Sequence, residues 1–320
     1  MENDNKDRSK LLFTIADYAF LFIFHLTRLM ARILPASAMY LLANAFGYLL
    51  YYGRPFMHQR LLAKISESLP EISDQHEIAL IGREACCSFF RPIIELFLFK
   101  KYEDRCMKNL QIEGMEFLDQ AESESDGRGI LMLLSHVGNF GLFPPIMARL
   151  DRPCPFITFS PLDTPVPRYT MAMGLLLWSL DCGPDPPGFF KDTIKQVRQH
   201  LNQGKRIGIG FDVEGNYVVE FMGKPAALAS GIAHFAVDTG APIVPAVLLR
   251  RAKPLMYTLK FYKPLTYDLT GDRKKDIGII MREVIKAGER KIREAPDQYL
   301  NWFGLWHWWD KAKQLSKDTE

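Results

Sequence analysis

A short apolar run that ends in Ser-His is the feature that most constrains how this chain folds. Ile130–Leu134 is five consecutive apolar residues, which is typical of a short buried β-strand. Ser135–His136 follows at once, Gly138–Asn139 interrupts the strand, and residues 142–150 are expected to form a helix. In open α/β sheets, ligands bind beyond the carboxyl ends of the strands. His136 is therefore a candidate for chemistry, although a loop histidine held only by backbone groups is an equally ordinary reading.

The rest of the chain predicts an α/β fold. Short apolar runs at 207–211 and 258–261 have the length of strands, whereas 192–203 and 276–293 have the length and amphipathic pattern of helices. Alternation of such segments is typical of a sheet covered by helices. We therefore expect a central mixed β-sheet flanked by helices, preceded by an apolar helical region at the N-terminus.

The N-terminal region is poor in charge. Between Leu11 and Tyr52 the full charges are Asp17, Arg28 and Arg32. A spanning helix needs about 20 mostly apolar residues, and two arginines would then mark its inner end. Asp17 and the aromatic residues around it fit a hairpin of two interfacial helices equally well. A pair of buried core helices is the third alternative, and only the first two attach the protein to a membrane.

Composition narrows the function further. The formal net charge is +3, and no P-loop or GxGxxG fingerprint occurs, so no nucleotide cofactor and no nucleic-acid partner are expected. Five cysteines without a CxxC spacing argue against a disulfide framework or a zinc site and fit a reducing compartment. A basic field in the central part suits anionic lipid or phosphate groups, although some of these residues would also fit a solvated helix face. Its members are Arg149, Arg152, Lys191, Lys195, Arg198, Lys205, Arg206, Arg250, Arg251 and Lys253.

The segment around His136 resembles the lysophospholipid acyltransferase superfamily, and most closely its lipid A late-acyltransferase branch. Members of that branch carry an H-x4-D/E motif at the end of a strand, as His-x-Gly-Asn followed by an aromatic residue and an acid. This chain matches at His136, Gly138, Asn139 and Phe140. It departs at Gly141, which stands where the family has the acid.

Further family motifs occur in the same order along roughly residues 33–305. Pro161–Pro165 is similar to a Pro-Leu-x-x-Pro loop that precedes a helix, which Arg168 opens here. Asp212–Gly215 resembles the family's Asp-x-Asp-x-Gly turn, and residues 218–226 resemble its aromatic-Gly-x-Pro-Ala hairpin. Several motifs in register make the resemblance fairly specific.

The resemblance implies a membrane-associated acyltransferase. It would move an acyl group from an acyl carrier protein or CoA thioester to a hydroxyl of a lipid or glycolipid acceptor, without a bound cofactor or metal, at the cytoplasmic face of a bacterial inner membrane. The expected division is membrane-associating helices at 1–55, an acyltransferase domain at 56–310 and a polar tail at 311–320. Two alternatives are transfer of an aminoacyl (glycyl) group and a non-catalytic lipid-binding protein of the same fold.

By the same resemblance, His136 acts as a general base that an acid orients. Gly141 cannot supply that acid. Asp212 or Glu214 is expected to substitute, because both follow a strand that should neighbour the His136 strand. The alternatives are a slow enzyme without an orienting acid and a histidine that has lost its role.

Three further residues are candidates for substrate binding. Gly138 and Asn139 precede the predicted helix, where backbone N–H groups favour a developing negative charge. Two roles are open for Asn139, a hydrogen bond to its own loop or binding of the thioester carbonyl. Arg168 is a candidate contact for an acceptor phosphate, although a surface helix start explains it equally well.

Overall fold

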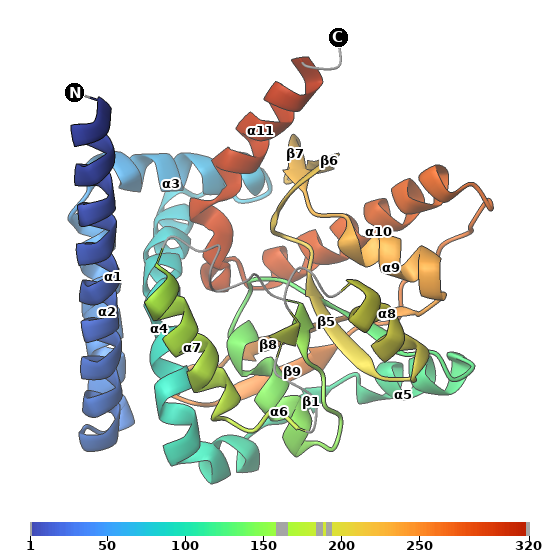
Figure 1. Ribbon diagram of the computed structural model, residues 1–320, viewed down its shortest axis with the longest axis horizontal. Helices are drawn as coiled ribbons and strands as arrows, with labels where there is room; N and C mark the ends of the chain where they lie inside the picture. The colour runs from blue at the N-terminus through green and yellow to red at the C-terminus, as the bar shows by residue number, and fades with distance from the viewer. Residues whose placement is uncertain (1, 158–165, 184–187, 190–193, 318–320) are drawn as a thin grey trace.

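The computed structural model of this protein describes residues 2–157, 166–183, 188–189 and 194–317. The chain begins with four helices and continues into a sheet that helices cover on both faces (Figure 1). The first four helices are α1 (Glu2–Ile33), α2 (Ala36–Tyr52), α3 (Pro55–Ser68) and α4 (Gln75–Lys108). The later helices are α5 (Met115–Glu124), α6 (Phe143–Arg149), α7 (Pro167–Trp178), α8 (Ile194–Asn202), α9 (Gly231–Thr239), α10 (Arg273–Glu294) and α11 (Leu305–Lys317). Short 3-10 turns are η1 (Phe140–Leu142), η4 (Pro296–Gln298) and η5 (Leu300–Phe303).

The main sheet is mixed, which confirms the predicted fold class. Within the described residues its strand order is β1-β9-β8-β2-β5-β3-β4, and the β8–β9 pair is antiparallel while the other pairs are parallel. A separate hairpin is formed by β6 and β7. The strands are β1 (Gln111–Glu113), β2 (Ile130–Leu134), β3 (Phe156–Ile157), β4 (Gly188–Phe189), β5 (Arg206–Gly210), β6 (Glu214–Phe221), β7 (Lys224–Leu228), β8 (Ile243–Arg250) and β9 (Tyr257–Phe261).

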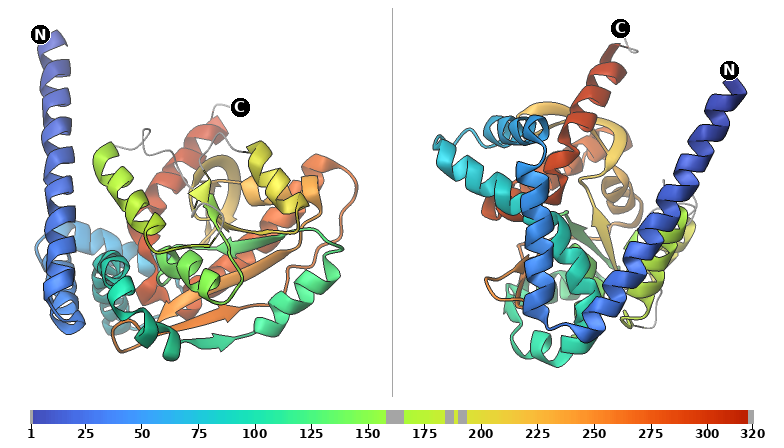
Figure 2. Two further views of the ribbon diagram at one scale, coloured as in Figure 1. Left: turned by 60° about the horizontal axis from the view of Figure 1, so that its bottom comes forward. Right: turned by 90° about the vertical axis from the view of Figure 1, so that its left-hand side faces the viewer.

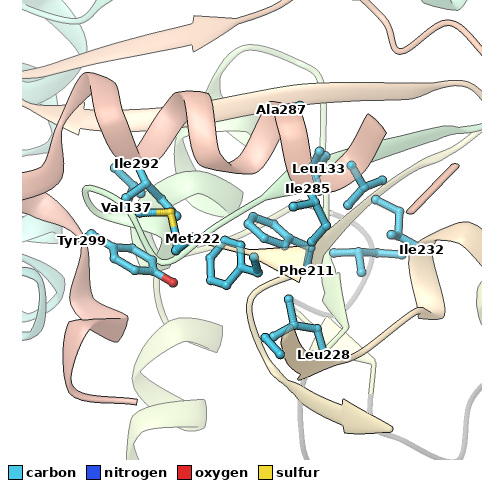
Figure 3. Close-up of a cluster of buried hydrophobic side chains, with 14 of the residues drawn as sticks. Leu133, Val137, Phe211, Met222, Leu228, Ile232, Ile285, Ala287, Ile292 and Tyr299 are labelled. Atoms are coloured by element: carbon cyan, nitrogen blue, oxygen red, sulfur yellow. The ribbon is translucent and has the colours of Figure 1, made fainter. Parts of the chain in front are cut away.

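Strand β2 is buried on both faces and separates two halves of the core. All five of its side chains are buried, as its apolar run predicted. Leu131 and Leu133 pack in a cluster with α8, α9 and α10, part of which Figure 3 shows. Ile130 and Met132 pack in a second cluster with α5, α6 and the later turns of α4. This alternation is the ordinary consequence of successive side chains pointing to opposite faces of a strand.

One close contact in the first cluster depends on a glycine. The ring of Phe211 lies against Gly288 of α10, where an added Cβ would stand 2.1 Å from the Phe211 Cζ atom. Phe211 is fully buried and immediately precedes Asp212. The packing of α10 therefore fixes the segment that carries one of the candidate acids.

Gly288→Ala should destabilise the protein because the new methyl group overlaps the Phe211 ring. Gly278→Ala, on the same helix, is the matched control, since the nearest atom to its Cβ would be the Tyr217 hydroxyl oxygen, at 3.3 Å. Both changes gain similar helix propensity. We expect the free energy of unfolding of Gly288→Ala to be lower than that of Gly278→Ala by about 1–3 kcal/mol, in denaturant titrations followed by fluorescence. Equal values would contradict the close packing of Phe211 on α10.

The N-terminal helices differ in how they pack. Helix α2 lies against α4, with Met39 and Ala43 in the core. Helix α1 stands at one side of the molecule and its N-terminal half extends beyond the rest (Figure 2). Among the described residues, one helical segment, Leu11–Ile33, is long and apolar enough to cross a membrane by length and composition, and 11% of its most apolar window is buried. Neither helix is a buried core helix, because α2 buries one face and exposes Leu41, Phe46 and Leu49 on the other, while α1 is exposed over most of its length.

Some segments predicted from the sequence lie partly or wholly outside the described residues. The loop at 161–165 lies outside them, as do the first two residues of the helix expected at 192–203. The stretch 311–320, set apart as a polar tail, continues α11 as far as Lys317, and Ala312 within it is buried. The remaining predicted strands and the 276–293 helix lie within one to three residues of β5, β9 and α10.

Candidate active site

Two parallel neighbouring strands bring His136 and Asp212 to one edge of the sheet. Strands β2 and β5 pair in register, with Leu134 opposite Gly210. His136 and Asp212 each lie two residues beyond these partners, at the carboxyl ends of their strands. The parallel pairing that the sequence predicted is confirmed, and it explains why residues 76 positions apart meet.

The two side chains are in direct contact. The His136 Nδ1 atom lies 3.1 Å from Asp212 Oδ1, and the His136 backbone N–H donates to Asp212 Oδ2 at 2.9 Å. Asn301 adds a third contact, because its amide donates to the Asp212 carbonyl at 2.8 Å and lies 3.0 Å from His136 Nδ1. A carboxylate only accepts hydrogen bonds, so we assign the shared hydrogen to Nδ1. Nε2 is then the unprotonated ring nitrogen.

Burial and charge act on His136 in opposite directions. The Asp212 side chain is fully buried, whereas a quarter of the His136 side chain is exposed. Burial lowers the pKa of His136, but the charge of Asp212 and its hydrogen bond outweigh burial and raise that pKa above the ordinary value. The imidazolium that forms when His136 accepts a proton is thus stabilised by Asp212.

The other candidate acid, Glu214, lines the same cavity as His136 but is paired with a different residue. Glu214 is exposed at the start of β6, and its carboxylate forms an ion pair with Lys311 of α11 at 2.7 Å. The chain bends at residues 211–213 between β5 and β6, so that Asp212 is buried while Glu214 is exposed. The geometry therefore favours Asp212 over Glu214 as the residue that orients His136.

Gly138 and Asn139 form the turn behind His136, and their polar groups are already used there. The Gly138 N–H donates to the Gln298 carbonyl at 3.1 Å, and the Asn139 N–H donates to the Leu248 carbonyl at 2.9 Å. Gly138 has φ 71°, and a Cβ there would stand 2.0 Å from the Leu248 oxygen, so the turn requires glycine. The Asn139 side chain is completely buried. Both backbone N–H groups are therefore already hydrogen-bonded within the fold.

Glu95 of α4 is hydrogen-bonded to this turn. Its carboxylate accepts hydrogen bonds from the Asn139 side chain and the Tyr40 hydroxyl, and it lies 3.9 Å from the Arg250 Nε atom. Arg250 also donates to the Gly138 carbonyl at 3.1 Å. Burial raises the pKa of the Glu95 carboxyl, opposed by Arg250 and these hydrogen bonds. The network joins α2, α4 and β8 to the turn that follows His136.

Glu95→Ala should be strongly destabilising, because it leaves the buried Arg250 and Asn139 groups without their partner. Loss of one member of a buried charged pair costs about 3–5 kcal/mol. Glu95→Gln keeps the size and most hydrogen bonds, so its loss should be clearly smaller. Thermal and denaturant unfolding of both variants would measure this, and equal stability of Glu95→Ala and the parent protein would refute the network.

Gly141 is buried against helix α4 rather than beside the pair of His136 and Asp212, which we call the dyad. A Cβ there would lie 3.4 Å from both the Asn139 Oδ1 and Leu96 Cδ2 atoms. The carboxylate in contact with His136 is that of Asp212, two residues beyond the end of β5.

A cavity of about 670 Å³ opens beside the dyad. His136 and Phe140 line one end, and the His136 and Phe140 rings are 4.6 Å apart in an edge-to-face contact. Val197 of α8 and Phe235 of α9 are part of its mainly apolar wall. Ser135 lines the same cavity, and its hydroxyl is buried without a hydrogen-bond partner among the described residues. Such a cavity suits an apolar chain attached to a polar reacting group.

Two buried polar side chains near the dyad belong to no local sequence pattern that predicts a functional site. Lys291 of α10 donates to the carbonyls of Leu133 and Ala246 at 2.8 and 3.3 Å, and burial lowers its pKa to about 7 against the opposing charge of Asp212. The Tyr299 hydroxyl is completely buried, and burial together with the Asp212 charge raises its pKa well above the usual value. Sequence reasoning missed both, as well as Asn301 and Glu95, because each comes from a distant helix or turn.

Arg168, the candidate contact for phosphate, lies away from the dyad. Its guanidinium pairs with Asp17 of α1 at 2.8 Å, at the start of α7. Among the described residues, no group of three or more His, Cys, Asp or Glu side chains could hold a metal ion.

No curated protein matches the chain significantly. The family model of the bacterial lipid A biosynthesis acyltransferases matches residues 6–307, which include the whole sheet, the dyad and the cavity. With nearly its entire length matched, the chain belongs to the bacterial lipid A biosynthesis acyltransferase family.

Proposed function

We propose that this protein transfers an acyl group from a thioester to a hydroxyl of a lipid or glycolipid, with His136 as the general base and Asp212 as the acid that orients it. The observation that carries the proposal is the contact of His136 with a fully buried carboxylate at the mouth of an apolar cavity. Histidine suits the task because its pKa lies near neutrality.

The reaction needs one proton carrier and no covalent enzyme intermediate. His136 Nε2 accepts the proton of the acceptor hydroxyl while the hydroxyl oxygen attacks the thioester carbonyl carbon. Asp212, held at Nδ1, stabilises the resulting imidazolium. As the C–S bond breaks, the imidazolium returns its proton to the leaving thiolate. An ester and a free thiol are formed, and His136 is again neutral.

The cavity provides a place for the acyl chain and its carbonyl group. Its apolar wall removes hydrocarbon from water, which stabilises the bound chain by about 25 cal/mol per Å². Ser135 offers a hydroxyl without a partner next to His136, so it is the donor available to the carbonyl oxygen as negative charge develops. The amides of Gly138 and Asn139 are engaged in the fold and take no part in this proposal.

The donor, the acceptor and the location follow from the family and remain proposals. We infer an acyl carrier protein or CoA thioester as donor, a membrane lipid or glycolipid as acceptor, and action at the cytoplasmic face of a bacterial inner membrane. The family and the apolar helix at Leu11–Ile33 support membrane association. The dyad itself selects a hydroxyl and a thioester but no particular chain length.

The test is transfer by purified full-length protein from a panel of radiolabelled acyl carrier protein and CoA thioesters, of several chain lengths, to a bacterial lipid extract. A labelled lipid product that requires His136 is expected. Hydrolysis of the thioester without any lipid product, or no consumption of any donor, would contradict the proposal.

A further inference from the structure

The one acidic residue in the apolar stretch of α1 is paired with the catalytic domain. Asp17 is 3% exposed. Its carboxylate accepts from Arg168 Nη1 at 2.8 Å and from the backbone N–H groups of Arg168 and Tyr169 at 3.0 and 3.4 Å. These are among the first amides of α7, so Asp17 acts as a cap for α7 although 151 residues separate it from Arg168. The pair fixes α7 against α1.

Aromatic contacts extend this junction along α1. The Arg168 guanidinium lies over the Tyr18 ring, 4.5 Å from its centroid. The Tyr169 ring packs against Phe20 and Phe24, with centroids 5.6 and 6.4 Å apart. Helices α1 and α7 are thus joined by charge, hydrogen bonds and ring packing over about two turns of α1.

The opposite side of α1 is an exposed apolar stripe. Asp17, Phe24 and Ala31 recur every seven residues and form the buried side. The exposed stripe repeats at intervals of three or four residues, which places its members on one face. Its members are Leu11, Ile15, Tyr18, Phe22, Leu26, Leu29 and Ile33. The exposed Arg28 and Arg32 follow Asp17 by about three and four turns and so lie toward its side of the helix.

Helix α7 exposes a second apolar stripe. Met171, Leu175 and Trp178 lie at intervals of four and three residues and are about half exposed, and none of the α7 residues is buried. Arg168 is one turn before Met171 on the same face, and its side chain is 50% exposed. This face of α7 is therefore apolar, with one cationic side chain, Arg168, at its N-terminal end.

A spanning α1 is physically costly in this arrangement. The segment Leu11–Ile33 would cross a hydrocarbon core of about 30 Å, and Asp17 would lie about 9 Å inside its outer end. The half-exposed Arg168 would then face lipid at that depth, where a charged side chain is unfavourable. Helix α7 would also have to enter the bilayer with its whole length.

We propose that α1 does not cross the membrane but lies in the plane of one leaflet with α7 beside it, so that the two helices form one membrane-binding surface. The partner is a bilayer that contains anionic phospholipid. The apolar stripes of α1 and α7 enter the acyl region, while Arg28, Arg32 and Arg168 reach the phosphates. The Asp17–Arg168 pair makes this a rigid attachment rather than a tether. This inference rests on the membrane location in the proposed function.

Depth-dependent quenching separates the two arrangements. All five native cysteines are buried, so a cysteine introduced at the surface of the full-length protein can be labelled selectively with a fluorophore. We would label Ile15→Cys, Phe22→Cys and Leu29→Cys in separate proteins, bind each to phosphatidylethanolamine–phosphatidylglycerol vesicles, and quench with lipids brominated at different depths. An in-plane helix gives the same shallow depth at all three positions. A Phe22 probe about 10 Å deeper than the other two would overturn the proposal.

A second measurement tests whether α7 belongs to the membrane-binding surface. Leu175→Cys carries the probe on the α7 stripe, and Leu269→Cys, in the exposed segment before α10, is the matched control. We expect brominated lipid to quench the Leu175 probe several-fold more than the Leu269 probe. Equal quenching, with equal access to aqueous iodide, would exclude α7 from the surface.

Loss of the ion pair should release α7 while α1 stays bound. In Asp17→Asn, or in Arg168→Gln as a second variant, quenching at Leu175 should fall toward the control value while quenching at Phe22 persists. Unchanged quenching at Leu175 in both variants would refute the rigid attachment. These readouts do not depend on catalysis, so a protein inactive with every thioester but quenched as expected would overturn the proposed function and leave this inference standing.

Discussion

Replacement of His136 by alanine is expected to lower the turnover of acyl transfer by about 10²- to 10⁴-fold, the usual contribution of a positioned general base. The fold should persist, because a quarter of the His136 side chain is exposed and its backbone N–H still donates to Asp212 in the variant. Steady-state kinetics with a radiolabelled thioester, beside a thermal unfolding curve, would measure both effects.

His76→Ala is the matched control for this experiment. His76 is exposed near the start of α4, far along the chain from the dyad, and its substitution should leave turnover unchanged. Near-normal transfer by His136→Ala would exclude His136 as the base. A loss of transfer that comes with a much lower unfolding temperature would instead assign the histidine a role in the fold.

Replacement of Asp212 by asparagine is expected to cost about 10²- to 10⁴-fold in turnover. In the serine-protease triad, the same change of the orienting acid stabilises the wrong histidine tautomer and costs about 10⁴-fold. Here the carboxylate holds the hydrogen on Nδ1, and an amide in its place can donate to Nδ1 and move the hydrogen to Nε2. A base with a protonated Nε2 cannot accept the proton of the acceptor.

The pH profile of the Asp212→Asn enzyme gives a readout that a merely structural role would not change. Asp212 raises the pKa of His136, so in the parent enzyme the base is protonated, and inactive, up to a pH above the ordinary histidine value. Removal of the charge should lower this pKa, and the acid limb of kcat/KM should move to lower pH. An unmoved acid limb would show that Asp212 does not act on the base.

Glu214→Gln separates the two candidate acids. The Glu214 carboxylate is exposed and paired with Lys311, so its neutralisation should change turnover little and leave the acid limb in place. A loss in Glu214→Gln as large as in Asp212→Asn would mean that the exposed carboxylate, rather than the buried one, serves the base.

Local sequence patterns predicted much of the framework of the site. Strand β2 has the predicted bounds because five consecutive apolar residues can be buried on both faces of a sheet. The parallel neighbour β5 followed from the same pattern, and with it the meeting of His136 and one of the downstream acids at one edge. The departure at Gly141 was also visible, and it directed attention to an acid elsewhere in the chain.

What the sequence alone determined about this protein is its strands, its helices and the edge at which its chemistry is placed, because hydrophobic periodicity is a local property of the chain. The tertiary structure decided which of the two acids meets His136. Asp212 and Glu214 are two residues apart, and Asp212 is buried next to Phe211, which packs on α10, while Glu214 is exposed and paired with Lys311. Asn139 donates to Glu95 of α4, and Arg168 pairs with Asp17 of α1. These partners lie too far away along the chain for a local sequence pattern to predict them. A buried polar side chain is satisfied by whichever element the fold brings to it, and that is a property of the packed structure.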